Sequence, residues 1–323
     1  MNTSSAPVGG LAPTVTDCAL PTVSVIIVTH GRPQLVAAAL GAVLGQTYGG
    51  EMDCIVVHDK EEPRHELTGG ATPGRRIRVV SNTHTPGLAG ARNTGLDLAE
   101  GSFVATCDDD DVWHPTKLQR QVDLLMKRPD LLVVGSGLRF LLPDGKRADW
   151  PARSELIDRK LLLRNRVKEL HSSTLVMRRD AFAKAGRYDE TLPSGYAEDY
   201  DWVLRASRVG RIGAVTAPLA DIRKDGQSYY KGRADRTVAG LEFFLQKHPE
   251  IAESRRGHAR ILGQIAFYRS SAGERSEGLR CAGKAFLRWP ASPHVYLAAA
   301  QATTGIDAER FARMLRRFGR GTA

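Results

Sequence analysis

The sequence predicts an α/β fold built on a mostly parallel sheet, followed by a helical region. Short β-branched runs, such as VSVIIV at 23–28, alternate with helix-like segments over the first 130 residues. That alternation is typical of a parallel sheet whose strands are buried on both faces. Beyond residue 230 only helix-like segments follow. We therefore expect a disordered arm at 1–20, an α/β domain at 21–230 and an α-helical C-terminal extension at 231–323.

The first half of the chain supplies strands and helices in strict alternation. Apolar β-branched runs predict the strands, and prolines or glycine-rich turns precede the helices. The expected strands are 23–28, 53–58, 77–80 and 103–107, and the expected helices are 33–46, 89–98 and 115–127. Ligands of such sheets bind beyond the carboxyl ends of the strands. His30, Asp59 and the carboxylates after residue 107 are therefore expected in one cleft.

The second half departs from this alternation. Residues 131–150 read as strands joined by a Pro-Asp-Gly turn, and the segments after them mix strands with helices. Strands are expected at 172–179 and 212–223, and helices at 155–163, 198–208, 234–247, 251–271, 276–288, 293–302 and 307–318.

Four adjacent carboxylates, Asp108 to Asp111, follow the strand at 103–107. Carboxylates this close repel one another unless a cation compensates, and Mg²⁺ and Mn²⁺ prefer such oxygen ligands. The alternative is an acidic surface loop in which Asp111 or a neighbour caps the next helix. The surrounding motifs favour the metal site.

Positive charge is concentrated near the C-terminus. The net charge is +10, and residues 231–323 hold 17 Lys and Arg against 8 Asp and Glu. Partners for such a surface are a nucleotide diphosphate, an anionic membrane face or nucleic acid, with a solvated helix surface as the alternative.

The cysteines and the N-terminus bear on the compartment. Cys18, Cys54, Cys107 and Cys281 lack metal-ligand spacing, and two of them lie in apolar runs that favour burial. Residues 1–20 lack the features of a signal peptide, and no apolar run is long enough to span a bilayer. We expect a cytoplasmic protein, with peripheral contact at the inner membrane face through the basic region.

Several motifs occur in an order known from one enzyme family. They are VSVIIVTHGRP at 23–33, GQTY at 45–48, CIVVHD at 54–59, GLAGARNTGLDLAEG at 87–101 and the carboxylate run followed by Trp113, Pro115 and Lys117-Leu118. Over 23–228 the chain resembles the family 2 glycosyltransferases of GT-A fold, a Rossmann-like fold of nucleotide-diphospho-sugar transferases. The resemblance implies inverting transfer of a sugar from a UDP- or dTDP-linked donor to an acceptor hydroxyl.

The resemblance also assigns a donor site. It implies that Asp110 and Asp108 hold Mn²⁺ or Mg²⁺, which assists departure of the nucleoside diphosphate. Asp108 and Asp109 would contact the ribose or the waters of the metal. Asp59 would accept the ring N–H of the base, and His30 would stack on that base. The other nucleotide contacts would come from Arg32, Arg92 and Asn93.

The pair Glu198-Asp199 matches the acidic pair at which the family places its catalytic base. Asp199 would take the proton of the acceptor hydroxyl, and burial by Tyr196, Tyr200 and Trp202 is expected to raise its pKa. The alternative is a pair of acids favoured by the helix N-terminus. Candidate contacts to the acceptor or the diphosphate are Glu198, His171 and Lys224.

Two other functions compete with this hypothesis. A sugar-phosphate nucleotidyltransferase would need a glycine-rich phosphate loop after the first strand, which THGRPQ at 29–34 does not provide. A non-catalytic nucleotide-binding module would use the basic region to bind nucleic acid or a membrane. That region lacks the interleaved aromatic residues of single-strand binders, which disfavours nucleic acid. The acceptor stays open between a glycan, a lipid-linked glycan, a natural product and a peptide.

Overall fold

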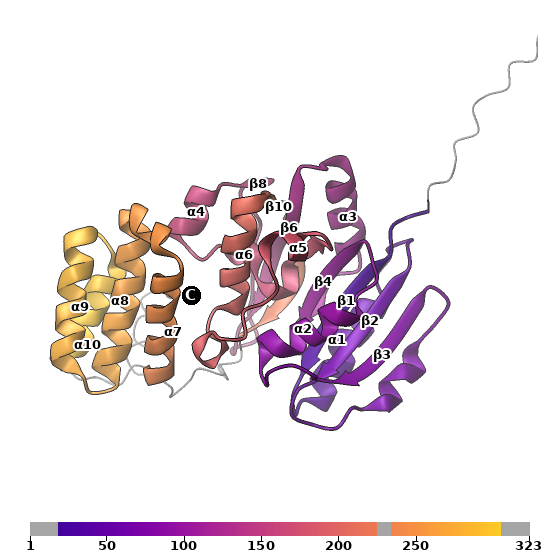
Figure 1. Ribbon diagram of the computed structural model, residues 1–323, viewed down its shortest axis with the longest axis horizontal. Helices are drawn as coiled ribbons and strands as arrows, with labels where there is room; N and C mark the ends of the chain where they lie inside the picture. The colour runs from indigo at the N-terminus through magenta and orange to yellow at the C-terminus, as the bar shows by residue number, and fades with distance from the viewer. Residues whose placement is uncertain (1–18, 225–233, 305–323) are drawn as a thin grey trace, which may run out of the picture.

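The computed structural model describes residues 19–224 and 234–304. A twisted mixed sheet forms its centre, and a stack of helices stands beside the sheet at the end remote from the N-terminal strands (Figure 1). The predicted helix at 307–318, Cys18 and almost all of the predicted N-terminal arm lie outside the described residues.

The sheet combines a parallel half with a mixed half. Its strand order is β3-β2-β1-β4-β9-β6-β10-β5, with β7 paired to β6 and β8 paired to β10. β1 to β4 are mutually parallel, whereas β9 runs antiparallel to both β4 and β6. The strands are β1 (Val23–Thr29), β2 (Met52–His58), β3 (Arg75–Ser81), β4 (Phe103–Asp108), β5 (Val112–Trp113), β6 (Leu131–Leu141), β7 (Arg147–Trp150), β8 (Leu156–Ile157), β9 (Val176–Arg178) and β10 (Arg211–Arg223).

Helices cover the sheet and build the C-terminal stack. The helices are α1 (Pro33–Leu44), α2 (Leu88–Leu98), α3 (Lys117–Lys127), α4 (Arg159–Arg164), α5 (Ala181–Ala185), α6 (Glu198–Val209), α7 (Ala234–Lys247), α8 (Arg255–Ser271), α9 (Arg275–Arg288) and α10 (Pro293–Thr304). Within the described ranges, none of these helices is both long enough and apolar enough to cross a membrane.

Three sequence predictions need correction. The expected helix at 155–163 is shorter, because residues 156–157 pair with β10 as β8 and the Asp158 side chain then caps α4. The expected strand at 172–179 starts only at Val176, since Ser172–Thr174 form a 3₁₀ turn. The expected helix at 251–271 is interrupted at Ser254, whose hydroxyl accepts the Gly257 N–H and caps α8.

The central strands are buried on both faces, as their composition predicts. Every residue of β1 is buried, and alternate residues face two different hydrophobic clusters. Cys54 and Cys107 are buried free thiols within these strands. The four-strand parallel core is therefore confirmed.

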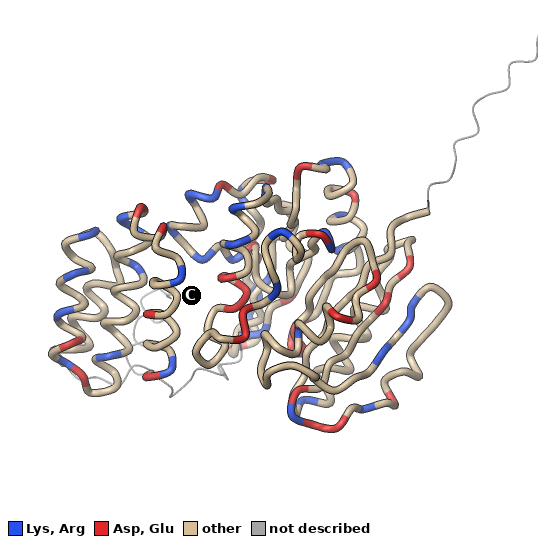
Figure 2. The backbone as a smooth tube through the Cα atoms, viewed as in Figure 1, with Lys and Arg blue, Asp and Glu red and all other residues tan. Residues whose placement is uncertain are grey.

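The helical stack shares a core with the sheet domain. Phe244 and Ile261, from α7 and α8, belong to the same buried cluster as Trp202 of α6. The ring of Phe244 stacks on Tyr200 with centroids 4.9 Å apart. Lys and Arg recur along α8 and α9 (Figure 2). The boundary drawn at residue 230 stays a prediction, but hydrophobic packing is continuous across it.

Candidate active site

The ends of β1, β2 and β4 bring the predicted donor residues together. The strand register sets Thr29 beside His58 and Val28 beside Asp108. The His30 ring donates through Nδ1 to the carbonyl of Asp59 at 2.6 Å, and the Thr29 hydroxyl donates to Asp109 at 2.8 Å. The expected convergence at one edge of the sheet is therefore confirmed.

Asp109 and Asp110 share one arginine. The Arg32 guanidinium donates to Asp109 at 3.1 Å and to Asp110 at 3.0 Å. Burial and the neighbouring charges of Asp108 and Asp109 raise the pKa of Asp110. Its side chain remains 30% exposed, so a ligand can reach it.

Asp111 is buried and links β10 to the 172–174 turn through hydrogen bonds, and it does not cap a helix. It accepts the Ser173 hydroxyl at 2.5 Å and the Arg223 backbone N–H at 3.1 Å. Burial and the charges of Asp108 and Asp110 raise its pKa well above the usual range. The helix-cap alternative is therefore wrong, because both of its oxygens serve β10 and the 172–174 turn.

Arg92 connects the two acidic groups that the sequence singled out. Its guanidinium is 2% exposed and lies between Asp108, at 2.8 Å, and Glu198. Asp108 also accepts the Ser172 hydroxyl at 2.5 Å. Burial is the largest single effect and raises the pKa of Asp108, but Arg92, His171 and the Ser172 hydrogen bond together outweigh it and leave a net lowering. One buried cation thus joins the end of β4 to the start of α6.

Asn93 has a different environment from the one expected of a nucleotide contact. Its side chain is buried, donates to the carbonyl of Tyr188 at 2.9 Å and accepts the N–H of the same residue at 3.1 Å. Its contact to nucleotide stays a prediction. The nearby Gly90 meets the protein's own backbone, since a Cβ there would lie 1.9 Å from the Thr85 carbonyl oxygen.

Asp59 is oriented by the loop before α2. Its Oδ1 accepts the Asn82 amide at 2.9 Å and the Gly87 N–H at 3.1 Å. Lys60 approaches Oδ2 at 3.9 Å. The side chain of His58 is buried and hydrogen-bonds Glu61 at 2.8 Å, in keeping with a structural histidine.

Asp199 is held by an arginine that the sequence gave no sign of. Arg166 donates to its two oxygens at 2.8 and 2.7 Å, and the Tyr200 N–H adds a third bond at 2.7 Å. Burial is the largest single effect and raises the pKa of Asp199, but Arg166, His171 and Arg92 together outweigh it, so the net shift is downward. The expectation of a raised pKa is therefore wrong. Arg166 sits in LLLRNRVKEL among other basic residues, so no local pattern distinguishes it.

His171 lies between the two acidic groups. Asp108, Asp111 and His171 each place one ligand atom within 4.8 Å of the others. Burial lowers the pKa of His171 to about 4, although the charges of Asp108 and Asp199 act in the opposite direction. The ring is neutral near pH 7 and can act as a metal ligand. The structure thus groups Asp108 with a histidine that was predicted only as an acceptor or diphosphate contact.

Lys224 directly follows β10. Its ammonium group lies 5.3 Å from the centre of the Phe140 ring. Burial and the charge of Arg166 lower its pKa. Its contact to diphosphate or acceptor stays a prediction.

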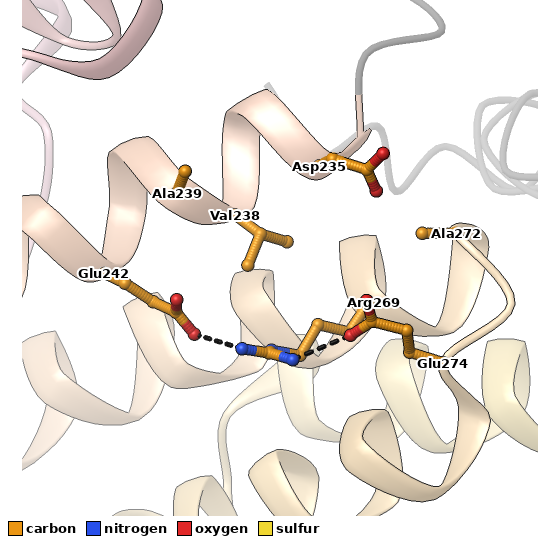
Figure 3. Close-up of a pocket in the computed structure, with 7 residues that line it drawn as sticks. All are labelled: Asp235, Val238, Ala239, Glu242, Arg269, Ala272 and Glu274. Atoms are coloured by element: carbon orange, nitrogen blue, oxygen red, sulfur yellow. Dashed lines mark hydrogen bonds and ion pairs between the residues drawn. The ribbon is translucent and has the colours of Figure 1, made fainter.

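A pocket between α7 and α8 lies outside this site (Figure 3). Arg269 crosses it and pairs with Glu242 at 2.6 Å and Glu274 at 2.7 Å. None of the predicted site residues lines it. This pocket is therefore separate from the predicted site.

The parallel strands end in carboxylates, and a second acidic pair on α6 faces them. Together with the strand order, these features define the class of the protein, which is an α/β protein of GT-A fold. The family model described as glycosyl transferase family 2 matches residues 24–186, and the chain belongs to that family. The resemblance drawn from its motifs is confirmed.

Named relatives agree with this assignment. The chain is 32% identical over 105 residues to the UDP-Glc:alpha-D-GlcNAc-diphosphoundecaprenol beta-1,3-glucosyltransferase WfgD of Escherichia coli, covering 32% of this chain and 41% of that protein. It is 28% identical over 218 residues to the amylovoran biosynthesis glycosyltransferase AmsB of Erwinia amylovora, covering 61% and 68%. The chain spans less than two thirds of the length of the first curated relatives that it matches.

Solved structures confirm the fold. S. aureus TarS 1–349 in complex with UDP superposes with a TM-score of 0.60 at 18% identity, covering 92% of each chain. The mannosyltransferase PcManGT of Pyrobaculum calidifontis, in complex with GDP-Man and Mn²⁺, gives a TM-score of 0.55 at 17% identity, covering 90% of this chain and 89% of that one. At these identities the likeness concerns the fold alone.

Proposed function

We propose that this chain is an inverting glycosyltransferase that moves a sugar from a UDP- or dTDP-linked donor to an acceptor hydroxyl. One observation carries the proposal: Arg92 bridges Asp108 of the β4 end and Glu198 of the α6 start, next to Asp199. A site for the donor phosphates and a site for a proton acceptor therefore adjoin. A nucleotidyltransferase or a non-catalytic binding module would leave unexplained why a second buried acidic pair, Glu198 and Asp199, lies beside Arg92.

The donor would bind along the strand ends. Oδ2 of Asp59 would accept the ring N–H of the base, while Oδ1 stays bonded to Gly87 and Asn82. The exposed ring of His30 lies beside Asp59 and can stack on the base. Arg32 lies beside Asp109 and Asp110, where it would meet ribose or phosphate oxygens.

A divalent cation, Mn²⁺ or Mg²⁺, fits the residues present. Asp108 and Asp110 would hold it, and His171, which places a ligand atom within 4.8 Å of ligand atoms of Asp108 and Asp111, would be a further ligand. The raised pKa values of Asp110 and Asp111 show carboxylates crowded together, which a cation would relieve. When bound, the metal would neutralise the charge that develops on the departing nucleoside diphosphate.

Asp199 would act as the general base. Its carboxylate is ionised near pH 7, because Arg166 keeps its pKa low. It would take the proton of the acceptor hydroxyl as the oxygen attacks the anomeric carbon, and attack opposite the leaving group inverts that carbon. Glu198 stays paired with Arg92 and positions the start of α6.

The acceptor is proposed to be a lipid-linked glycan. The relative WfgD carries a diphosphoundecaprenol-linked acceptor in its name. Helix α9 offers a surface for a membrane that holds such a substrate, because Leu279, Phe286 and Leu287 are 45%, 46% and 78% exposed. Exposed Arg280 and Arg288 lie on the same helix. Exposed apolar residues beside cations are typical of helices that bind an anionic bilayer surface.

A panel of nucleotide sugars, each offered with and without Mn²⁺, tests the donor proposal by thermal shift. We expect stabilisation by one base class, and only in the presence of the metal. A protein that no activated sugar stabilises in manganese would contradict the proposal.

The base assignment is tested by Asp199→Asn. The amide cannot take a proton, so turnover should fall by about 10²- to 10⁴-fold. Affinity for the nucleoside diphosphate, measured by calorimetry, should stay unchanged. Asp180→Asn, which alters an exposed carboxylate paired with Lys184, serves as the control and should retain turnover. Normal turnover in Asp199→Asn would refute the assignment.

A further inference from the structure

Three cations gather beside Asp199 with too few anions to pair them. This cation cluster consists of Arg166, Lys168 and Lys224. Arg166 is bonded to Asp199. Among the residues that the structure describes, neither Lys168 nor Lys224 forms an ion pair with a carboxylate. The cluster therefore carries an excess of positive charge next to the proposed base.

Both lysines are brought together by the β6–β7 hairpin. The ammonium groups of Lys168 and Lys224 lie 5.2 and 5.3 Å from the centre of the same Phe140 ring. Lys168 also lies 3.9 Å from the centre of the Trp150 ring. Aromatic faces attract cations but cannot neutralise two of them.

The cations of the cluster also repel one another. Burial lowers the pKa of Lys168 and the charge of Lys224 lowers it further. The pKa of Lys224 is lowered by burial and then by the charge of Arg166. Asp110, Asp111 and Asp199 attract Lys224, but only from beyond ion-pair distance. A cation bound by the acidic turn, which we define as Asp108 to Asp111, would weaken even that attraction.

We propose that the cation cluster of Arg166, Lys168 and Lys224 is a subsite for a phosphate or pyrophosphate group beside the transfer site. A group with two or more negative charges and several acceptor oxygens matches three converging donors better than a single carboxylate does. Two substrates could supply it: the donor diphosphate, reached from Asp110, or a phosphate of the acceptor, reached from Asp199. The subsite rests on the proposed function for its role, but its binding chemistry can be measured alone.

The test uses inorganic pyrophosphate titrated calorimetrically into the full chain in EDTA, so that no metal bridges the anion to the acidic turn. Wild-type protein should bind it. Lys168→Met and Lys224→Met keep the apolar stem over Phe140 and should each weaken binding by about tenfold, because each removes a charged donor. Lys160→Met, a lysine on α4 outside the cluster, should bind as wild type does. Thermal melting checks that each variant is folded.

A second arm identifies the source of the phosphate. UDP and Mn²⁺ are titrated together into the same variants, with dTDP in place of UDP if the donor panel selects it. If Lys168→Met weakens the affinity for the nucleotide as much as it weakens the affinity for pyrophosphate, the subsite is assigned to the donor diphosphate. Unchanged nucleotide affinity, with weakened pyrophosphate binding, assigns it to the acceptor.

Failure of this inference is distinguishable from failure of the proposed function. If wild-type protein ignores pyrophosphate, or if both lysine variants bind it as wild type does, the subsite is overturned even when UDP and Mn²⁺ bind normally. If pyrophosphate binds through the lysines while no nucleotide sugar binds, the subsite stands and the proposed function fails.

Discussion

Arg92 shows how one residue can set the geometry of a whole site. A guanidinium buried to 2% exposure needs partners, and it has Asp108 on one side and Glu198 on the other. The guanidinium carbon Cζ of Arg92 also lies 5.4 Å from the centre of the Tyr188 ring. Removing it would leave the buried Glu198 carboxylate without its cation, which is costly, and would take one of the hydrogen bonds from the partly buried Asp108. The donor end and the acceptor end of the site are therefore fixed relative to each other by a single side chain.

Arg166 controls the ionisation of the proposed base. In wild-type protein Arg166, together with His171 and Arg92, outweighs burial and keeps the pKa of Asp199 lowered, so the acid limb of kcat/KM should lie below the pKa of a free aspartate. Arg166→Met removes the largest of these opposing charges, so burial weighs more and the pKa of Asp199 rises. The acid limb should then move to higher pH. The measurement is the pH dependence of kcat/KM.

A matched arginine gives the control for this profile. Arg164 is exposed on the same segment, and no ion pair with a carboxylate is found for its side chain within the described residues. Arg164→Met should leave the acid limb where wild type has it. An unshifted profile in Arg166→Met would show that Arg166 does not set the pKa of the base.

Lys117 is a buried ammonium group that no mechanism step uses. It is fully buried, lacks a hydrogen-bond partner among the described residues, and its ammonium group lies 3.8 Å from the centre of the Trp113 ring. Burial lowers its pKa to about 7, with a small opposing effect of Cys107. Between pH 7 and the unfolded value of 10.5 the unfolded chain binds a proton that the folded chain does not. Folding stability should therefore rise with pH over this window.

Lys117→Met should remove that pH dependence. Methionine fills a similar volume without a charge, so the variant should be more stable than wild type at pH 7 and should lose the rise in unfolding free energy toward higher pH. Urea unfolding at pH 7 and pH 10 checks both results. Lys127→Met, at the end of the same helix, should keep the wild-type difference between the two pH values. A parallel pH response in Lys117→Met would contradict the burial argument.

At the scale of elements, contacts from α7 fix the position of α6. The buried Asp201 of α6 accepts a hydrogen bond from His248 at 2.9 Å and lies 2.7 Å from Lys247. Phe244 of α7 stacks on Tyr200, one residue after Asp199. The left-handed backbone of Ala197, at φ 60°, begins this helix. The position of Asp199 thus depends on a helix that the sequence places in a separate region.

Phe244→Ala should loosen this support. Truncating a fully buried phenylalanine costs about 3–5 kcal/mol, and the rate of sugar transfer should fall because the start of α6 is no longer fixed. Tyr296→Ala truncates an aromatic side chain that is 58% exposed on α10. It should alter stability by no more than about 0.5 kcal/mol. Urea unfolding and transfer rates are measured together, below the melting temperature of both variants. Equal losses of stability and of transfer rate in the two variants would argue against the proposal that α7 supports α6.

The elements that could be predicted are those with a local signal. The strands 23–28, 53–58 and 103–107 were readable because short runs rich in apolar and β-branched residues lie there, and the acidic residues at their ends followed from sheet topology. The Ser172–Thr174 turn and the Arg166 partner were not readable. Their conformations are decided by Asp108, Asp111 and Asp199, which lie far away in sequence. The raised pKa predicted for Asp199 failed for the same reason.

At the scale of the whole molecule, the chain separates an acidic transfer site from a basic outer helix. The acidic turn and the start of α6 face each other across Arg92. Helix α9 lies at the outer end of the helical stack (Figure 1), and two of its three large exposed apolar side chains, Phe286 and Leu287, lie near its C-terminal end. A protein that docks through α9 would keep its transfer site free for a nucleotide donor from solution.

Docking through α9 makes a quantitative prediction for lipid vesicles. Leu287 is 78% exposed, and a charge in its place would oppose both insertion and attraction to anionic lipid. Leu287→Glu should reduce co-sedimentation with phosphatidylglycerol-containing vesicles by about tenfold or more, because it removes buried apolar area and adds a negative charge. Met126→Glu changes an apolar side chain that is 55% exposed on α3, so it should bind vesicles as wild type does. Binding should also fall as salt is raised, since the cations of α9 act over about one Debye length. Vesicle binding that survives Leu287→Glu, or that Met126→Glu weakens equally, would place the membrane contact elsewhere on the molecule.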